Sequence, residues 1–340
     1  MSTDLTNAIR TTVAGASLTA PQMTSAMGAI MDGTASEIEI AAFLTALAAK
    51  GETADEIAGA AAAMRQRVTV VPATTGGLLD TCGTGGDRLN TFNISTATAI
   101  VVAACGVPVA KHGNRSATSS SGSAEVLQTL GVNIELPPDR VAACIDEIGI
   151  GFCYARLLHS AMKHVAPVRA SLGFRTIFNL LGPLTNPAGA RFQLLGTTSV
   201  ATAEKLARAV SKLGTERTIV VCGNDQLDEV ALWGTTTAFV VEGPNLRRLE
   251  WTAADLGLPE CDVATLRVDS PQASADRITG LLSGEPGPSL DIVLANAGMA
   301  LWCVGQAPAP LDGVLRAGEC VRSGACTDKL RRLVEWTNAG

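Results

Sequence analysis

The sequence is poor in several residue types, and each shortage excludes a class of protein. Charged residues make up 17% of the 340 residues and hydrophobic ones 47%, so the chain is too apolar to be disordered. Its net charge of -6 contrasts with the basic balance of nucleic-acid binders, so we expect no nucleic-acid partner. Long apolar runs are also missing. The longest, residues 97–110, is broken by Thr98, Gly106 and Pro108, so we expect no membrane insertion.

Histidine and paired cysteines are scarce as well. The nine cysteines are scattered without a CxxC pair, and there are three histidines, so no zinc cluster is expected. We interpret the cysteines as reduced thiols of a cytoplasmic protein. Residues 1–12 lack a basic start followed by an apolar run, so we expect no secretion signal.

Helix signals dominate the first seventy residues or so. Glycines at the ends of apolar periodic segments predict helix stops, and nothing in this segment is typical of a strand. Three pairs match the capping box that begins a helix: Thr19 with Gln22, Thr34 with Glu37, and Thr53 with Glu56. The pattern predicts a small helical domain over residues 1–72.

Strand and helix patterns then alternate. We predict strands at residues 78–81, 107–110, 132–136, 151–154, 192–195 and 218–222, and helices at 95–105, 123–131, 138–148 and 202–213. Such alternation predicts a large doubly wound α/β domain with a mostly parallel central sheet, over residues 73–161 and 187–340. The helical insertion at residues 162–186 is expected to join the small domain. Ligands are expected at the carboxyl ends of the strands.

A glycine-rich segment, DTCGTGGDRLNTFNIST at residues 80–96, is the first candidate site. Consecutive amides in a turn with positive φ bind anions, and such a turn is favoured by its three glycines, Gly83, Gly85 and Gly86. An ordinary tight turn would also use glycines. However, Asn93, Ser95 and Thr96 then open a helix whose N-terminus favours phosphate, so we interpret the segment as a phosphate site.

The second candidate is KHGNRSATSSSGSAE at residues 111–125, between a predicted strand and a helix. It offers the cations Lys111 and Arg115 and the donors Asn114, Ser119 and Ser123. A flexible serine-rich linker is the alternative, but a linker would not be bracketed so closely by a strand and a helix.

An acidic pair, Asp228 and Glu229, follows the predicted strand at residues 218–222. A solvated acidic turn would look the same. In a chain with two phosphate-type loops, these hard oxygen ligands indicate Mg²⁺ instead.

A further candidate is Arg169 in the segment HVAPVR, because its planar fork matches a carboxylate. The alternative is an exposed helix arginine. His112, His159 and His164 could act as general bases, although single histidines are more often structural.

Taken together, the segments GTGGD, NIST, KHGNR, SSGSAE, APVR, RTIFNLLGPLTNP and LDE resemble the anthranilate phosphoribosyltransferase family in order and spacing. The resemblance runs from about residue 3 to residue 335. It implies transfer of a phosphoribosyl group from phosphoribosyl pyrophosphate to anthranilate, an active site in the cleft between the domains, Mg²⁺ as cofactor, and a homodimer formed through the small domains.

The resemblance also implies roles for individual residues. The donor phosphoribosyl pyrophosphate would be bound by Gly83, Gly86, Asp87, Thr91, Asn93, Ser95, Thr96, Lys111 and Ser123. Anthranilate would meet Gly83, Asn114 and Arg169. Magnesium would be held by Ser95, Asp228 and Glu229, and the catalytic groups would be Lys111, Asp228 and Glu229.

The chain departs from the family pattern at Glu125, Arg156 and Ser160, where the family often has Asp, Pro and Pro. These positions lie toward the acceptor side. Two alternatives remain: a pyrimidine nucleoside phosphorylase of the same wider fold, and an inactive relative that senses nucleotides.

Overall fold

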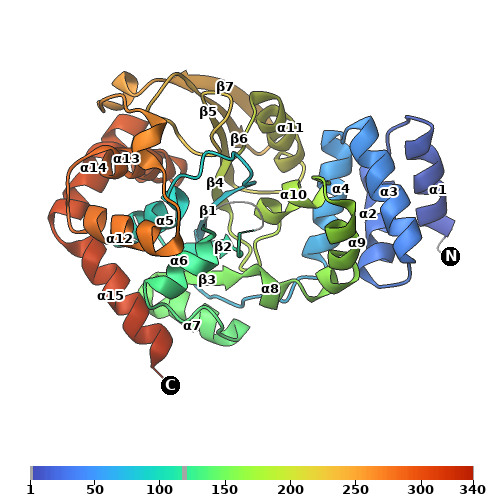
Figure 1. Ribbon diagram of the computed structural model, residues 1–340, viewed down its shortest axis with the longest axis horizontal. Coiled ribbons are helices and arrows are strands. Elements are labelled where there is room, and N and C mark those ends of the chain that lie inside the picture. The colour runs from blue at the N-terminus through green and yellow to red at the C-terminus, as the bar shows by residue number, and fades with distance from the viewer. Residues whose placement is uncertain (1–2, 117–120, 340) are drawn as a thin grey trace.

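The computed structural model describes residues 3–116 and 121–339. The chain begins with a helical domain whose four helices lie together at one end of the molecule (Figure 1). They are α1 (Thr3–Val13), α2 (Ala20–Met31), α3 (Glu37–Lys50) and α4 (Ala54–Arg65). The apolar residues of α3 recur at helical spacing, and the four that it buries are Ile40, Phe43, Leu44 and Leu47.

Capping boxes begin α2, α3 and α4, and two of the three predicted pairs are confirmed, those of Thr19 and Thr53. The prediction for Thr34 is wrong, because Ser36 caps α3. The Ser36 hydroxyl accepts from the Glu39 N–H, and the Glu39 carboxylate accepts from the Ser36 N–H. Thr34 belongs to the preceding helix end, because its N–H and hydroxyl both donate to the Ala29 carbonyl. Two capping-box matches overlap in this segment, and the end of α2 decides between them.

The helical insertion packs against this domain, although it lies much later in the sequence than the four helices. It contains the 3₁₀ helix η1 (Ser160–His164), α9 (Ala166–Leu172) and α10 (Phe178–Leu181). Helix α9 contacts α3, η1 contacts α2, and α10 contacts α4. Val165, Val168 and Phe178 are buried in the same apolar cluster as the residues of α3. The exact division of the domains, with residues 162–186 assigned to the small one, stays a prediction.

The α/β domain is built on one seven-stranded sheet of order β3-β2-β1-β4-β5-β6-β7. Its strands are β1 (Leu79–Gly83), β2 (Val109–Gly113), β3 (Ile150–Tyr154), β4 (Phe192–Gly196), β5 (Arg217–Gly223), β6 (Thr236–Glu242) and β7 (Asn245–Trp251). Strands β1 to β5 run parallel, and β6 and β7 are antiparallel additions at one edge. The predicted mostly parallel sheet is confirmed.

The strand order contains a switch point between β1 and β4. From β1 the chain moves outward to β2 and β3, and then returns to place β4 on the other side of β1. The loops after β1 and β4 therefore diverge, and in open α/β sheets ligands bind at such a point, outside the carboxyl ends of the strands.

Both faces of the sheet are covered, because successive side chains of a strand point to opposite faces. On β5, Ile219 and Val221 join one apolar cluster, while Val220 and Cys222 join another. The first cluster is covered by α5 (Ile94–Ala104) and by α12 (Pro271–Leu282), α13 (Pro288–Cys303), α14 (Pro310–Arg322) and α15 (Ala325–Asn338). The second is shared with α11 (Val200–Val210) and the helical domain.

The remaining elements are α6 (Ser123–Thr129), α7 (Pro138–Ile148), α8 (Ala155–Leu158) and the 3₁₀ helices η2 (Gly182–Leu184), η3 (Ala254–Leu256) and η4 (Val263–Leu266). In the described part of the chain, no helix has the length and apolarity that crossing a membrane requires.

One predicted strand, at residues 132–136, is wrong. Val132 and Ile134 are buried and alternate with exposed residues, as they would in a strand. The backbone, however, bonds to helix ends: the Val132 N–H donates to the Leu127 carbonyl, and the Asn133 N–H donates to the Thr337 hydroxyl. Every second residue is buried here because the segment runs between α6 and α15, and not because it pairs with a neighbouring strand.

Candidate active site

The loop after β1 carries the first candidate motif and lies at the switch point. Gly85 and Gly86 have φ of 64° and 87°, so the predicted positive-φ turn forms at these two positions. Gly83 is different, and the prediction of positive φ there is wrong. It is the last residue of β1, and its importance is steric: a Cβ on Gly83 would lie 2.3 Å from Oδ2 of Asp228.

The acidic pair reaches this loop by crossing the ends of two strands. Gly83 of β1 and Gly196 of β4 are paired neighbours in the sheet. A Cβ on Gly196 would lie 1.6 Å from the Asp228 carbonyl oxygen, so both glycines make room for the same segment. The Asp228 carboxylate then accepts a hydrogen bond of 2.7 Å from the Gly85 N–H. The structure thus joins the predicted metal ligands to the predicted phosphate loop.

Three carboxyl groups meet here, those of Asp87, Asp228 and Glu229. Burial and the adjacent Asp87 raise the pKa of Asp228 to about 6. Burial and Asp228 raise the pKa of Glu229 to about 8, although Lys111 and the Ser95 N–H oppose the shift. Burial also raises the pKa of Asp87. Like charges held this close favour a bound cation, and an all-oxygen donor set suits a hard divalent ion.

The N-terminus of α5 faces this acidic cluster. The Ser95 N–H adjoins the Glu229 carboxylate and lowers its pKa. The Thr96 hydroxyl is buried and has no hydrogen-bond partner in the described structure. Thr91 lies just before the helix, where it bridges to Arg267. The first turn of α5 therefore presents an orphaned hydroxyl and a helix N-terminus, both suited to anionic oxygen.

Asn93 joins the two candidate loops. It begins α5 without capping it, and its side-chain oxygen accepts hydrogen bonds from the hydroxyls of Ser121 and Ser274, at 2.7 and 2.8 Å. Its amide donates to the Ser121 carbonyl. Asn93 therefore holds the second loop against the first.

Lys111 is buried at the centre of the site. It is 3% exposed, and its Nζ donates to the Thr81 carbonyl at 2.6 Å and contacts the Ser95 hydroxyl at 3.4 Å. Among the described residues, no carboxylate lies within ion-pair distance of Nζ. A cation buried behind the acidic cluster without a direct counterion suits an anionic ligand.

The second candidate loop lies at the end of β2, as predicted. The Asn114 carbonyl accepts hydrogen bonds from the Ala124 N–H and the Ser123 hydroxyl, which closes the loop onto the start of α6. The Asn114 side chain is exposed and only its oxygen is engaged, by the Arg115 N–H. Ser119 lies outside the described residues.

Arg169 lies on α9 in the insertion, and its guanidinium is 5.5 Å from the centre of the Phe178 ring. Burial and the nearby Arg175 lower the pKa of Arg169. No carboxylate of a described residue lies within ion-pair distance of it. A half-buried arginine without a counterion favours the interpretation as an anion reader over that as a surface residue.

The histidines form a neutral buried chain. His112 Nδ1 lies 2.9 Å from the Gly182 carbonyl, so it carries the proton, and His112 Nε2 accepts from His159 Nε2 at 3.1 Å. Burial lowers the pKa of His112 to about 3 and that of His159 to about 4. His164 packs on Gly33 of the helical domain instead. The hydrogen bonds of His112 and His159 favour a positioning role for these two residues.

A second group of potential metal ligands consists of Asp80, Cys82 and His112. The two carboxylate oxygens of Asp80 accept from the His112 N–H at 3.0 Å and the Asn186 amide at 2.8 Å. Burial raises the pKa of Asp80 to about 6. These bonds tie β1 to β2 and to the returning chain, so we interpret the group as structural.

Arg175 is a contact that sequence reasoning missed. This exposed residue of the insertion donates to the carbonyls of Gly85 and Thr84 at 3.0 and 3.4 Å, and a Cβ on Gly86 would lie 1.7 Å from its Nη1. It links the insertion directly to the predicted phosphate loop. The sequence did offer a signal for this residue. Arg175 begins the segment RTIFNLLGPLTNP, which belongs to the same family resemblance as the glycine-rich loop.

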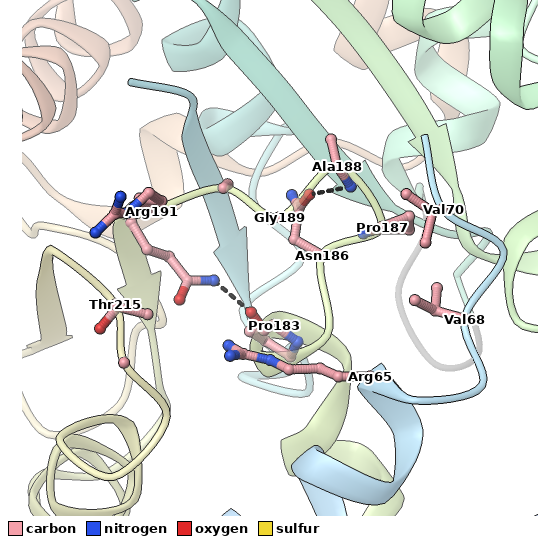
Figure 2. Close-up of a pocket in the computed structure, with 13 residues that line it drawn as sticks. Arg65, Val68, Val70, Pro183, Asn186, Pro187, Ala188, Gly189, Arg191 and Thr215 are labelled. Carbon is pink, nitrogen blue, oxygen red and sulfur yellow. Dashed lines mark hydrogen bonds between the residues drawn. The ribbon is translucent and has the colours of Figure 1, made fainter. Parts of the chain in front are cut away.

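A cavity of about 270 Å³ lies at the amino-terminal ends of β4 and β5, opposite the strand ends that carry the predicted site (Figure 2). None of the predicted site residues lines it. Arg65 does, and its guanidinium donates to the carbonyls of Leu184 and Leu213, which joins α4 to the large domain. We interpret this cavity as part of the hinge between the domains.

Comparisons with known proteins agree with this geometry. Residues 6–68 match the helical bundle domain of a glycosyl transferase family, and residues 75–327 match its a/b domain. The anthranilate phosphoribosyltransferase of Thioalkalivibrio sulfidiphilus is 45% identical over 98% of this chain and 99% of its own. That of Rhodospirillum rubrum is 47% identical over 97% of this chain and 95% of its own.

The chain belongs to the anthranilate phosphoribosyltransferase family.

Solved structures of this family have the same fold. The Thermus thermophilus enzyme superposes with a TM-score of 0.92 at 41% identity, covering 98% of this chain and 99% of that one. The Saccharomyces cerevisiae enzyme, in complex with phosphoribosyl pyrophosphate and Mg, superposes with a TM-score of 0.90 at 27% identity, covering 99% and 98%. Another structure of the yeast enzyme contains 4-fluoroanthranilate.

The structure places the three departures from the family pattern at the second loop and just before the insertion. Glu125 has a structural role: its carboxylate accepts from the N–H groups of Ser116 and Gly122, at 3.2 and 3.1 Å, and holds the second loop at the start of α6. Arg156 and Ser160 are exposed just before the insertion.

Proposed function

We propose that this protein transfers the phosphoribosyl group of phosphoribosyl pyrophosphate to the amine of anthranilate and releases pyrophosphate. One observation carries the proposal. The acidic cluster of Asp87, Asp228 and Glu229 lies between an amide-lined glycine turn and the N-terminus of α5. Carboxylates and anion-binding amides share a site where a metal bridges them to a phosphorylated ligand. The relatives that share this architecture are named for the same reaction.

The donor side supplies charge stabilisation. Loss of pyrophosphate leaves positive charge on the ribose and puts negative charge on the leaving group. Lys111, the Gly86 amide and the Thr96 hydroxyl are the groups offered to that negative charge. Asn93 and Ser123 hold the second loop in place against them.

Magnesium is the metal that these residues fit. Asp228 and Glu229, with Ser95 beside them, are oxygen ligands of the kind that this ion prefers. Burial and then a neighbouring carboxylate raise the pKa of both acids, and a bound cation would favour their ionised forms. Bound there, the ion would supply positive charge next to the leaving pyrophosphate.

The acceptor side needs recognition more than base catalysis. An aniline-type amine has a free lone pair, so no strong base must prepare it. We assign the anthranilate carboxylate to Arg169, with Asn114 and Gly83 as the other acceptor contacts. Positioning of the two substrates supplies much of the remaining rate enhancement.

The proposal extends to the setting of the enzyme. This activity would place the chain in tryptophan biosynthesis, in the cytoplasm, as a homodimer associated through the helical domains. Its domains would divide at the hinge, with residues 1–72 and 162–186 in the smaller one.

A direct assay tests the proposed reaction. The full-length protein is mixed with Mg²⁺, phosphoribosyl pyrophosphate and anthranilate, and the loss of anthranilate fluorescence is followed. We expect turnover that requires all three components and stops with a chelator. Phosphorolysis of a pyrimidine nucleoside without this activity would support the phosphorylase instead. Donor binding without turnover would support the ligand-sensing relative.

The metal role is tested in the same assay by Asp228→Asn combined with Glu229→Gln. We expect a folded protein whose turnover falls by roughly 10²-fold or more, as when a charge-stabilising group is lost. Glu260→Gln removes an exposed acid of the same domain and should change nothing. Near-normal turnover of the double variant at low Mg²⁺ would exclude these residues as metal ligands.

A further inference from the structure

Three thiols gather at the far end of the α/β domain, away from the proposed active site. Cys320 lies in the last turn of α14, Cys326 in the first turn of α15, and Cys105 at the end of α5. Helices α14 and α15 lie at the end of the molecule opposite the helical domain (Figure 1). The Sγ atoms of Cys320 and Cys326 are 3.9 Å apart, and Cys105 adjoins Cys320.

The surroundings of this cluster favour a thiolate. Arg316 donates to the Cys105 carbonyl at 3.0 Å, and Lys329 donates to the Ile148 carbonyl at 2.6 Å, so two cations flank the sulfurs. Cys326 adds the N-terminus of a 14-residue helix. The adjacent Cys105 and Cys326 thiols, followed by the charges of Arg316 and Lys329, hold the pKa of Cys320 well below its usual range.

Access separates Cys320 from Cys326, and Cys105 is partly exposed as well. Cys320 is partly exposed, whereas Cys326 is fully buried against it. A reactive thiol has to be both ionised and reachable, and its partner has to lie within reach of its sulfur. Cys320 meets the first requirement and Cys326 the second.

We propose that Cys320 is a peroxide-reactive thiol that forms a reversible disulfide with Cys326 and so joins α14 covalently to α15. The Cys320 sulfur attacks one peroxide oxygen: an S–O bond forms, the O–O bond breaks, and hydroxide leaves and takes a proton to become water. The Cys326 sulfur then attacks the oxidised sulfur of Cys320. An S–S bond forms, the S–O bond breaks, and a second water leaves. Two thiols are oxidised by two electrons and one peroxide is reduced to two waters.

The other cysteines of the chain provide controls. Cys261 is partly buried like Cys320, but its hydrogen-bonding neighbour is Thr265 and no thiol adjoins it. Cys144 and Cys303 are buried and donate to backbone carbonyls. Burial raises the pKa of Cys144 and of Cys303 to about 12, so we expect these thiols to stay reduced.

Mass spectrometry of the full-length protein tests the proposal. Trypsin cleaves after Arg316, Arg322 and Lys329, which places the two thiols in separate peptides, residues 317–322 and 323–329. The protein is treated with hydrogen peroxide, free thiols are alkylated in denaturant, and digestion follows without reductant. We expect the two peptides joined by a disulfide, formed at least about tenfold faster than oxidation of Cys261 and reversed by dithiothreitol. Cys320 oxidised no faster than Cys261, or joined to Cys105 instead, would overturn the proposal.

Serine variants give a second, independent readout. Cys326→Ser should leave a sulfenic acid on Cys320 that dimedone traps, and Cys105→Ser should keep the disulfide. Cys320→Ser should leave Cys326 reduced under peroxide. Oxidation of Cys326 in that variant at the unmodified rate would assign the reactive sulfur to Cys326 and contradict the proposal. The peptide masses report on the thiols alone, so the outcome does not depend on the transferase activity.

Discussion

At the scale of single residues, Arg169 is the residue that we propose distinguishes the two substrates. Anthranilate differs from aniline by one carboxylate, and Arg169 is a half-buried arginine with no carboxylate of a described residue within ion-pair distance. We expect Arg169→Ala to raise the KM for anthranilate roughly 10- to 150-fold, the equivalent of one charge-assisted contact of about 1.5–3 kcal/mol. Steady-state kinetics with each substrate varied in turn measure the effect.

Two further variants make that test specific. Arg169→Lys should restore the KM only partly, because a point charge lacks the fork of the guanidinium. Lys163→Ala, in an exposed position of the same insertion, should leave it unchanged. An equal loss for phosphoribosyl pyrophosphate would indicate a folding or hinge defect, and no loss for either substrate would return Arg169 to the surface.

Gly86 is the residue of the predicted phosphate loop at which we expect a larger side chain to be tolerated least. Its φ is 87°, and a Cβ would meet the Arg175 guanidinium. We expect Gly86→Val to weaken binding of phosphoribosyl pyrophosphate about tenfold or more, measured by calorimetric titration, with a smaller effect on the melting temperature. Gly189→Val is the matched control, because Gly189 has positive φ and open space but lies at the hinge cavity. Unchanged donor affinity for the Gly86 variant would remove this loop from the site.

At the scale of elements, the ends of β1 and β4 decide where the acidic segment lies. A Cβ on Gly196 would overlap the Asp228 carbonyl, so Gly196→Ala has to displace that segment from the strand end. We expect the Mg²⁺ concentration needed for half-maximal turnover to rise about tenfold or more, with a loss of stability of about 1–3 kcal/mol from overpacking. Turnover against Mg²⁺ concentration and urea unfolding give the two numbers.

The control for this substitution is Gly76→Ala. Gly76 has no atom near the position of an added Cβ and no positive φ, so alanine there should alter neither quantity. If Gly196→Ala loses stability but keeps its Mg²⁺ requirement, the contact between the strand end and Asp228 serves the fold alone.

At the scale of the whole molecule, the helical domain carries the two most exposed large apolar side chains. Ile38 on α3 is 82% exposed and Val13 on α1 is 71% exposed. Helices α1 and α3 contact each other, so the two side chains lie on adjoining helices, where a contiguous apolar patch would suit association. We expect the protein to sediment as a dimer and Ile38→Asp to weaken that dimer about 10²-fold or more, because a charge would be buried without a partner.

Leu315 is the matched control for the dimer. It is 59% exposed on α14, at the opposite end of the molecule from the helical domain (Figure 1). Leu315→Asp should leave the sedimentation of the protein unchanged. A dimer that is lost in the Leu315 variant but kept in the Ile38 variant would place the interface on the C-terminal helices.

The sequence alone predicted the features that depend on neighbouring residues. Helix starts such as Thr19 and Thr53, the alternation of strands with helices, and the loops at strand ends rest on bonds within a few residues or on side-chain periodicity. The same local character explains the errors. Two capping-box matches overlap near Ser36, and residues 132–136 show period-two burial without strand partners.

Only the tertiary structure decided how distant segments meet. The sequence placed Asp228 after a strand, but the crossing over Gly83 and Gly196 depends on β4 lying beside β1, and strand order is a non-local property. The reach of Arg175 to the phosphate loop likewise depends on how the insertion packs against the helical domain. The contact between Cys320 and Cys326 depends on the turn that brings α15 back against α14. Such contacts are set by the packing of whole elements against one another, which a local pattern of residues does not encode.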